Sequence, residues 1–287
     1  MRVLLCAICK LENRYIREWI EYHKDLGFDN IVLYDNNDID GERFEEVIAD
    51  YIQTGYVIIR NKRGLKYIQI DTYNECYREF HYYYDWIGFW DIDEFLEFEK
   101  VKTIQEFLGQ NIFSGQRWVR FCWKQYTDNN IVRVDGDYSV KRFTEVLTRE
   151  YCDNNGIPFS DFLGASAQCK SIVKTDVEEF KITSGHVYMP TIPAVNAVGQ
   201  MCFNDGVWIG TKEVWEGAWL NHYRFKTIEE YVLSKMVRLW PTDYKNGGKD
   251  GLTLDFFFEY NKRTPEKVEY ANSLLEIIRK EDKLINQ

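Results

Sequence analysis

Three Asp-x-Asp tripeptides have the residue types and spacing that suit metal chemistry. They are Asp38–Asp40, Asp91–Asp93 and Asp135–Asp137. The first lies in an asparagine-rich turn, and the third brackets Gly136, as hairpin turns do. Only the second follows an apolar run, Trp86–Trp90. Two carboxylates at the end of a buried strand repel each other unless a cation lies between them. Asp91 and Asp93 are therefore predicted to hold Mn²⁺ or Mg²⁺.

The first ninety residues alternate between apolar runs and apolar residues at helical spacing. Strands are predicted at Val3–Ile8, Ile31–Tyr34, Val57–Arg60 and Trp86–Trp90, with helices around residues 15–26, 44–51 and 73–84. Further strand-like runs are Trp118–Trp123 and Ser171–Val173, and helical spacing returns at Ile228–Leu239 and after Pro265. This order predicts a single α/β domain with a mostly parallel, Rossmann-like sheet flanked by helices and a less regular C-terminal half.

Polar residues follow each of the four predicted strands, at the edge where parallel sheets bind ligands. These candidates are Lys10 and Glu12 after the first strand, Asp35 after the second, Arg63 after the third, and Asp91 and Asp93 after the fourth. A carboxylate pair beside cationic groups suits a phosphorylated ligand with a bound cation. Glu12 and Lys10 equally fit the start of a helix, where acidic residues are favoured.

Composition narrows the partners and the compartment. The net charge of −10 opposes a nucleic-acid partner, which needs a basic surface. No apolar run approaches the roughly 20 residues of a membrane helix, and no secretory signal is recognisable. The odd number of cysteines, seven, predicts free thiols in a reducing cytoplasm. Cys6 and Cys9 form a C-x-x-C, but no second pair at zinc-finger spacing accompanies them.

Several blocks of this sequence resemble glycosyltransferase family 92 and its bacterial family-2-like relatives. The blocks are Lys10–Asn37, Tyr73–Cys76, Trp86–Leu96, Lys170–Val173, His186–Val187 and His222–Tyr231. The resemblance implies a GT-A fold, a nucleotide-sugar donor (often a UDP-sugar) and a divalent cation. It also implies a domain over residues 1–240, with a donor-binding half at 1–98 and an acceptor half at 99–240. Residues 241–287 then form a helical extension.

Roles for the candidate residues follow from this resemblance and from the chemistry of transfer. Asp93 is the predicted direct metal ligand, and Asp91 contacts the ribose or a metal-bound water. Asp35 is expected to accept from ribose hydroxyls, and Lys10 and Glu12 to contact the base. Other expected donor contacts come from Arg63, Arg224 and Lys226. His222 is either a metal or diphosphate ligand or a structural residue.

The acceptor hydroxyl requires a general base if the transfer inverts configuration. Asp161 is the chosen candidate among Asp161, Glu145 and Glu216. The segment Trp215–Thr227 mixes aromatic and cationic residues and fits either a mobile lid or a fixed core strand. Thr227 and Glu230 predict a capping box at the start of the next helix.

The sequence therefore predicts a metal-dependent glycosyltransferase that uses a nucleotide-sugar and a saccharide or lipid-linked glycan acceptor. Its expected location is the cytoplasm, either free or attached to the membrane surface. Two rivals are a sugar-binding or scaffold protein without turnover and a nucleotidyltransferase of similar fold. A haloacid-dehalogenase-type phosphatase is disfavoured, because its carboxylate pair follows the first strand.

Overall fold

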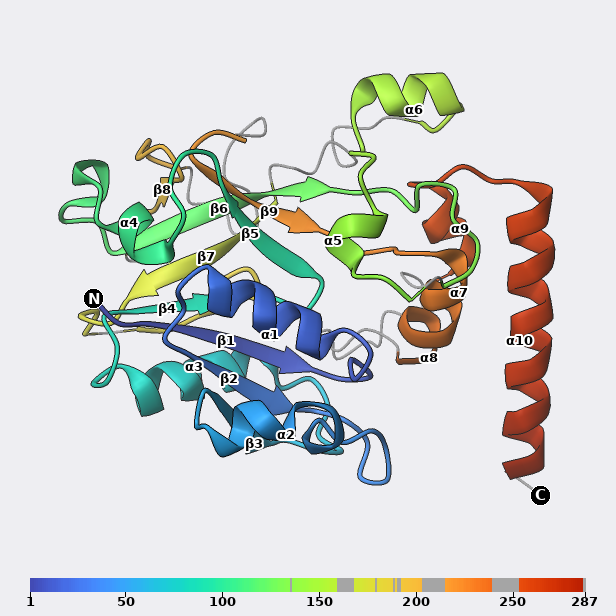
Figure 1. Cartoon of the computed structure of the whole chain (residues 1–287), viewed down its shortest axis with the longest axis horizontal. Helices are drawn as coiled ribbons and strands as arrows, with labels where there is room; N and C mark the ends of the chain where they lie inside the picture. The colour runs from blue at the N-terminus through green and yellow to red at the C-terminus, as the bar shows by residue number, and fades with distance from the viewer. Residues whose placement is uncertain are drawn as a thin grey trace. The chain divides into compact units, whose positions relative to one another are not determined.

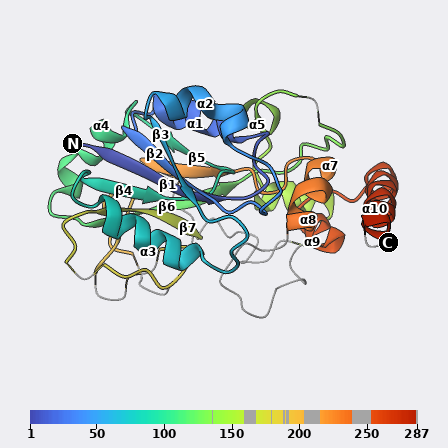
Figure 2. The same cartoon turned by 90° about the horizontal axis from the view of Figure 1, so that it is seen from below.

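The N-terminal third of the computed structural model is built from parallel strands joined by helices (Figure 1). The structure describes residues 1–134, 136–158, 168–178, 180–187, 189, 192–202, 215–238 and 253–285. The strands are β1 (Val3–Cys9), β2 (Asn30–Asp35), β3 (Val57–Asn61) and β4 (Trp86–Phe89), and the helices are α1 (Ile16–Asp25), α2 (Glu45–Gln53) and α3 (Gln69–Phe80). Helices α1 and α2 cover one face of these strands and α3 the other (Figure 2).

The rest of the sheet is mainly antiparallel. Its strands are β5 (Glu94–Phe98), β6 (Trp118–Gln125), β7 (Cys169–Lys174), β8 (Val195–Asn196) and β9 (Ala218–His222). The order along the sheet is β3-β2-β1-β4-β7-β6-β9-β5, and β8 pairs with β6. The predicted fold class is confirmed, but parallel pairing dominates only among the first four strands. The link from β4 to β5 is a turn, which is too short for a parallel crossover.

Further helical elements lie in the rest of the described chain, and all of them except the last are short. They are α4 (Ile104–Leu108), the 3₁₀ turn η1 (Asn111–Phe113), α5 (Ser139–Arg142), α6 (Arg149–Asn155), α7 (Ile228–Glu230), the π-helical η3 (Tyr231–Lys235), α8 (Met236–Arg238), α9 (Leu254–Phe258) and α10 (Pro265–Ile285). The predicted capping box is confirmed, because Thr227 and Glu230 exchange hydrogen bonds at the start of α7. Among the described helices, none combines the length and the apolar character needed to cross a membrane.

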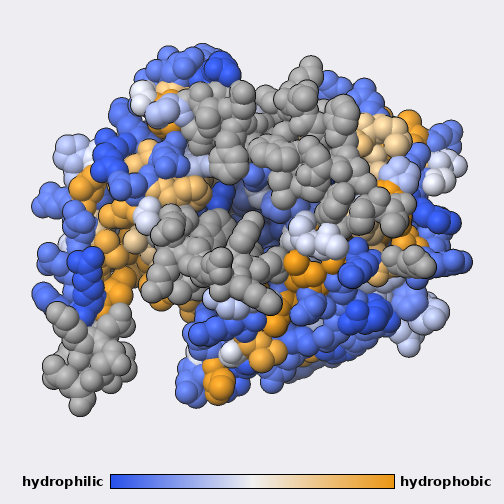
Figure 3. Space-filling view, turned by 180° about the vertical axis from the view of Figure 1, so that it is seen from behind, coloured by the Kyte–Doolittle hydropathy of each residue, from blue (hydrophilic) through white to orange (hydrophobic). Residues whose placement is uncertain are grey.

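The chain divides into two compact units made of discontinuous segments. One contains the described residues of Met1–Lys124 and Ala165–His222. The other contains the described residues of Gln125–Gly164, Tyr223–Trp240 and Asn246–Gln287. The functional boundaries at residues 98 and 240 stay a prediction. Hydrophilic residues prevail on the described surface seen in Figure 3, with smaller hydrophobic groups between them.

The apolar sequence of β1 suits its place at the centre of the parallel strands, between β2 and β4. All seven of its residues are buried, as expected for a strand covered on both faces. Helix α1 buries Ile16, Trp19, Ile20 and His23 along one side, at the spacing that the sequence predicts. All seven cysteines are free thiols in the structure, including Cys6 and Cys9.

Candidate metal and donor-binding site

A tight turn between β4 and β5 carries the central Asp-x-Asp tripeptide. The Glu94 N–H donates to the carbonyl oxygen of Asp91 at 3.1 Å, and the Asp91 N–H donates to Glu94 Oε2 at 2.9 Å. A Cβ atom on Gly88 would lie 2.6 Å from the Trp90 ring, so the glycine leaves room for this indole just before the turn. The packing of Trp90 thus sets the position of the turn that starts at Asp91.

Asp93, Glu94 and His222 form a buried cluster suited to a cation. One ligand atom from each lies within 4.8 Å of the others, and Asp93 Oδ1 is 3.6 Å from His222 Nε2. The pairing of β5 with β9 sets Glu94 opposite His222, which brings residues from distant parts of the chain together. Two carboxylates and an imidazole are ligands that suit Mn²⁺. Mg²⁺ is the alternative, although this harder Lewis acid prefers oxygen ligands alone. Glu94 Oε1 is buried without a hydrogen-bond partner among the described residues, as a ligand atom would be.

Asp91 lies beside this cluster but is held by other side chains. Its Oδ2 accepts from Lys170 Nζ at 2.8 Å, and its Oδ1 accepts from Gln69 Nε2 at 3.3 Å and from the Tyr73 hydroxyl at 3.4 Å. Burial opposes ionisation of Asp91, but Lys170 outweighs it and holds the pKa of this carboxyl below its ordinary value. These bonds fix the orientation of the Asp91 carboxylate. Its side chain is 37% exposed, so a ligand can reach it.

The predicted metal set of Asp91, Asp93 and His222 is thus only partly brought together. Asp93 and His222 meet, Glu94 joins them, and Asp91 is placed in an ion pair with Lys170. Burial raises the pKa of the Glu94 carboxyl well above its ordinary value, although the charge of Lys170 acts in the opposite direction. The sequence held one signal for Glu94, since it directly follows the tripeptide.

Aromatic and histidine rings line the same part of the first unit. The Trp123 ring centroid lies 4.3 Å from that of His222 and 5.1 Å from that of His186. His186 Nδ1 bonds the Cys169 carbonyl at 2.9 Å, and burial, assisted by Lys170, lowers the pKa of His186 to about 3. His186 is therefore neutral at physiological pH.

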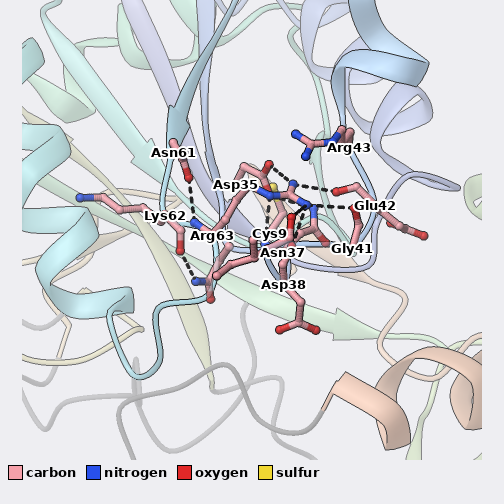
Figure 4. Close-up of polar contacts among 12 residues, drawn as sticks. Cys9, Asp35, Asn37, Asp38, Gly41, Glu42, Arg43, Asn61, Lys62 and Arg63 are labelled. Atoms are coloured by element: carbon pink, nitrogen blue, oxygen red, sulfur yellow. Dashed lines mark hydrogen bonds and ion pairs between the residues drawn. The ribbon is translucent and has the colours of Figure 1, made fainter. Parts of the chain in front are cut away.

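Asp35 and Arg63 form a separate ion pair that organises the loop after β2 (Figure 4). Arg63 Nη1 donates to Asp35 Oδ2 at 2.6 Å, and the same guanidinium donates to the carbonyls of Asp38, Gly41 and Glu42. The other oxygen of Asp35 accepts from the N–H and side-chain amide of Asn37. The structure gives both residues a positioning role; their direct contact with a donor stays a prediction.

Lys10 and Glu12 lie on the loop after β1. Lys10 Nζ bonds Asp38 Oδ1 at 2.7 Å, so it also contributes to this loop. The Glu12 carbonyl accepts from the N–H groups of Tyr15 and Ile16, which is the helix start that the sequence allowed as an alternative. Base recognition by these two residues stays a prediction.

The remaining candidates lie in the second unit, elsewhere in the first unit, or outside the described residues. Arg224 stacks on the Phe256 ring at 4.8 Å, and Lys226 is buried with a left-handed φ of 55°. Glu145 accepts weakly from the Thr127 hydroxyl at 3.4 Å in the second unit. In the first unit, Glu216 lines a 210 Å³ pocket with Glu99, Gln110 and neighbouring residues. Asp161 lies outside the described residues, as does Asp135 of the third tripeptide.

The segment Trp215–Thr227 contains a core strand. All five residues of β9, Ala218–His222, are buried, and they pair with Glu94–Phe98 of β5. Of the two predicted alternatives, the structure shows the fixed strand for this part of the segment. His222 is the last residue of this buried strand.

Comparisons with known proteins agree with the resemblance seen in the sequence. The family model "Glycosyltransferase family 92" matches residues 6–200. A glycosyltransferase family 92 protein of Ricinus communis is 24% identical over 271 residues, which cover 86% of this chain and 40% of that protein. The galactan beta-1,4-galactosyltransferase GALS3 of Arabidopsis thaliana is 25% identical over 188 residues, 62% of this chain and 36% of its own length. The chain thus spans less than half the length of these two curated relatives.

Among solved structures, S. aureus TarS in complex with UDP-GlcNAc is similar at a TM-score of 0.44. The sequence identity is 9%, and the match covers 90% of this chain and 72% of that one.

Proposed function

The chain belongs to glycosyltransferase family 92, and from this premise we propose that it transfers a hexose from a nucleotide-sugar to a glycan with the help of a divalent cation. The observation that carries the proposal is the buried cluster of Asp93, Glu94 and His222 at the end of a core strand. We further propose a UDP-sugar as the donor and a saccharide or lipid-linked glycan as the acceptor. Because the relative GALS3 is a galactosyltransferase by name, UDP-galactose is the first donor to test.

Asp93, Glu94 and His222 would hold Mn²⁺ or Mg²⁺. Such a cation supplies Lewis-acid stabilisation of the negative charge that develops on the leaving nucleoside diphosphate. Asp91, ionised and oriented by Lys170, Gln69 and Tyr73, can accept a hydrogen bond from a hydroxyl of the donor. These side chains are fixed before the donor arrives, so little reorganisation is needed at the moment of reaction.

Other residues complete the proposed donor site. Lys10, Glu12, Asp35 and Arg63 lie at the ends of β1, β2 and β3 and are proposed to surround the nucleoside. Lys10, Asp35 and Arg63 also shape the loop after β2. Arg224 and Lys226 are proposed diphosphate contacts, because their charges are opposite to that of the ligand. Asp161 remains the proposed base for the acceptor hydroxyl, with Glu145 and Glu216 as alternatives.

Release of UDP from UDP-galactose, with a glycan acceptor or with water, tests the proposal. Activity should disappear with EDTA and return with Mn²⁺. Asp93→Asn should lower the rate by about 100-fold or more, because it removes a ligand that stabilises the transition state. Asp40→Asn is the matched control, since Asp40 is the second aspartate of an exposed Asp-x-Asp tripeptide.

Two outcomes would contradict the proposal. Full activity in EDTA, or full activity of Asp93→Asn, would show that the reaction does not depend on a cation at this cluster. Donor-dependent thermal stabilisation without any turnover, tested over several UDP-sugars, would favour the sugar-binding protein instead.

A further inference from the structure

Lys170 places a buried positive charge beside the candidate metal ligands. Only 3% of its side chain is exposed. Its Nζ donates to Asp91 Oδ2 at 2.8 Å and to the Gly185 carbonyl at 3.3 Å, and it lies 3.9 Å from Glu94 Oε1. Lys170 thus binds the carboxylate beside the cluster, Asp91, and lies within ion-pair distance of one cluster carboxylate, Glu94.

The strand pairing explains how the lysine reaches this position. Lys170 lies on β7, opposite Phe121 of β6, and the next residue, Ser171, is opposite Phe89 of β4. The side chain therefore starts one residue from the end of β4 and meets the turn that follows it. A buried ammonium is stable there because the carboxylates compensate its charge.

The lysine and a divalent cation compete for the same negative charge. Asp91, Asp93 and Glu94 are the acidic groups, and Lys170 already neutralises one of them. A cation bound to Glu94 would be repelled by the ammonium group at short range, where screening by water is weak. The negative charge of a nucleoside diphosphate would offset this repulsion.

We propose that Lys170 weakens the binding of a free divalent cation to the Asp93–Glu94–His222 cluster, so that the cation binds together with the nucleoside diphosphate rather than alone. This inference rests on the proposed function, because it assumes that the cluster is the metal site. The effect is electrostatic and acts in the resting protein. If Lys170 had only a structural role, its substitution would change the stability of the fold but would not increase the affinity for Mn²⁺.

Binding of Mn²⁺ to the whole chain, measured by the electron paramagnetic resonance of free Mn²⁺, tests this directly. The wild-type protein should bind Mn²⁺ weakly alone and more tightly with UDP. Lys170→Met should bind Mn²⁺ alone about 10-fold more tightly or better, since a like charge is removed. The extra affinity gained by adding UDP should shrink accordingly.

Charge-balanced variants separate this effect from a loss of structure. Asp91→Asn should bind Mn²⁺ more weakly than wild type. The double variant Lys170→Met/Asp91→Asn loses one charge of each sign, so its affinity should return to within about threefold of wild type. Lys174→Met is the matched control, because Lys174 lies on the same strand and pairs with Asp176 at the surface.

The outcomes distinguish failure of the inference from failure of the proposed function. If Lys170→Met does not fold, the double variant is compared with Asp91→Asn, and about 10-fold tighter Mn²⁺ binding by the double variant supports the proposal. Unchanged or weaker binding in Lys170→Met, or equal binding by the double variant and Asp91→Asn, overturns the inference alone. A wild-type protein that binds no Mn²⁺ even with UDP overturns the metal site and the inference with it.

Discussion

At the scale of single residues, His23 shows how burial fixes a protonation state that supports the site. Its Nε2 accepts from the Trp90 indole N–H at 3.2 Å, so the proton lies on Nδ1, which donates to the Trp19 carbonyl at 2.8 Å. Burial lowers the pKa of His23 to about 3. This neutral imidazole holds Trp90, the residue that precedes Asp91.

The pKa of His23 predicts a pH dependence of stability. The unfolded chain binds a proton on this residue near its ordinary pKa of 6.5, whereas the folded chain does so only near 3. Between these values the unfolded state binds more protons, so stability falls as the pH decreases from 6.5 toward 3. The contribution of His23 is at most about 1.4 kcal/mol per pH unit.

Urea unfolding of wild type and of His23→Gln, at several pH values from 7 to 4.5, measures this contribution. Contributions from other residues are shared by the two proteins. The variant should be less stable at pH 7, because it loses the ring contacts, but its stability should depend less steeply on pH below 6.5. Parallel stability curves for the two proteins would contradict the prediction.

The local sequence pattern alone could predict the candidate site only where its residues are neighbours in the chain, whereas His222 became a candidate through the family resemblance. Asp91 and Asp93 stand out because they follow an apolar strand and are separated by a single residue. Lys170 is 79 residues away from Asp91, and its role depends on the register of β7 against β4. A sequence block that includes Lys170 resembled the family, but nothing in the local pattern indicates which carboxylate it meets.

At the scale of secondary structure, alternation and helical spacing were sufficient for the first four strands and three helices. Continuous apolar runs and a regular order constrain these elements locally. Strand β9 was ambiguous, because aromatic residues interleaved with His222 and Arg224 suit both a lid and a strand. Residues Ala218–His222 form a strand because they pair with β5, which lies more than a hundred residues earlier in the chain.

The burial and pairing of β9 predict its behaviour in hydrogen exchange. The paired amides of Ala218–His222 should be strongly protected in the free protein, because they open only with their part of the sheet. Addition of UDP and Mn²⁺ should change their relative protection little. Peptide-resolved exchange with and without these ligands checks this, and α3 provides an internal reference. Weak protection that appears only with ligand would mean that β9 orders on binding.

At the scale of the whole molecule, the division into two units does not follow chain order. The first unit is interrupted by Gln125–Gly164, which packs with segments near the C-terminus. No linker composition marks these boundaries in the sequence. The second unit has its own apolar core, which includes Phe225, Tyr231, Phe257 and Tyr260.

A buried ion pair connects α10 to another segment of the second unit. Lys267, in the first turn of α10, pairs with Asp128, and both side chains are buried. Lys267 Nζ also donates to Asn130 Oδ1 at 3.1 Å and to the Lys262 carbonyl at 3.0 Å. These contacts join the loop after β6 to the C-terminal helix.

Lys267→Met is expected to destabilise the second unit by about 3–5 kcal/mol, because it leaves the Asp128 carboxylate buried without its cation. Hydrogen exchange at increasing urea concentration should then show loss of protection in α9, α10 and α7, with β1–β4 as the reference. Lys262→Met is the matched control, since Lys262 contributes only its carbonyl to this contact and has an exposed side chain. The double variant Lys267→Met/Asp128→Asn should recover part of the loss, because the uncompensated charge is gone. If Lys267→Met keeps wild-type protection, the ion pair does not anchor α10, and the apolar contacts of the helix with Phe257 and its neighbours must hold it alone.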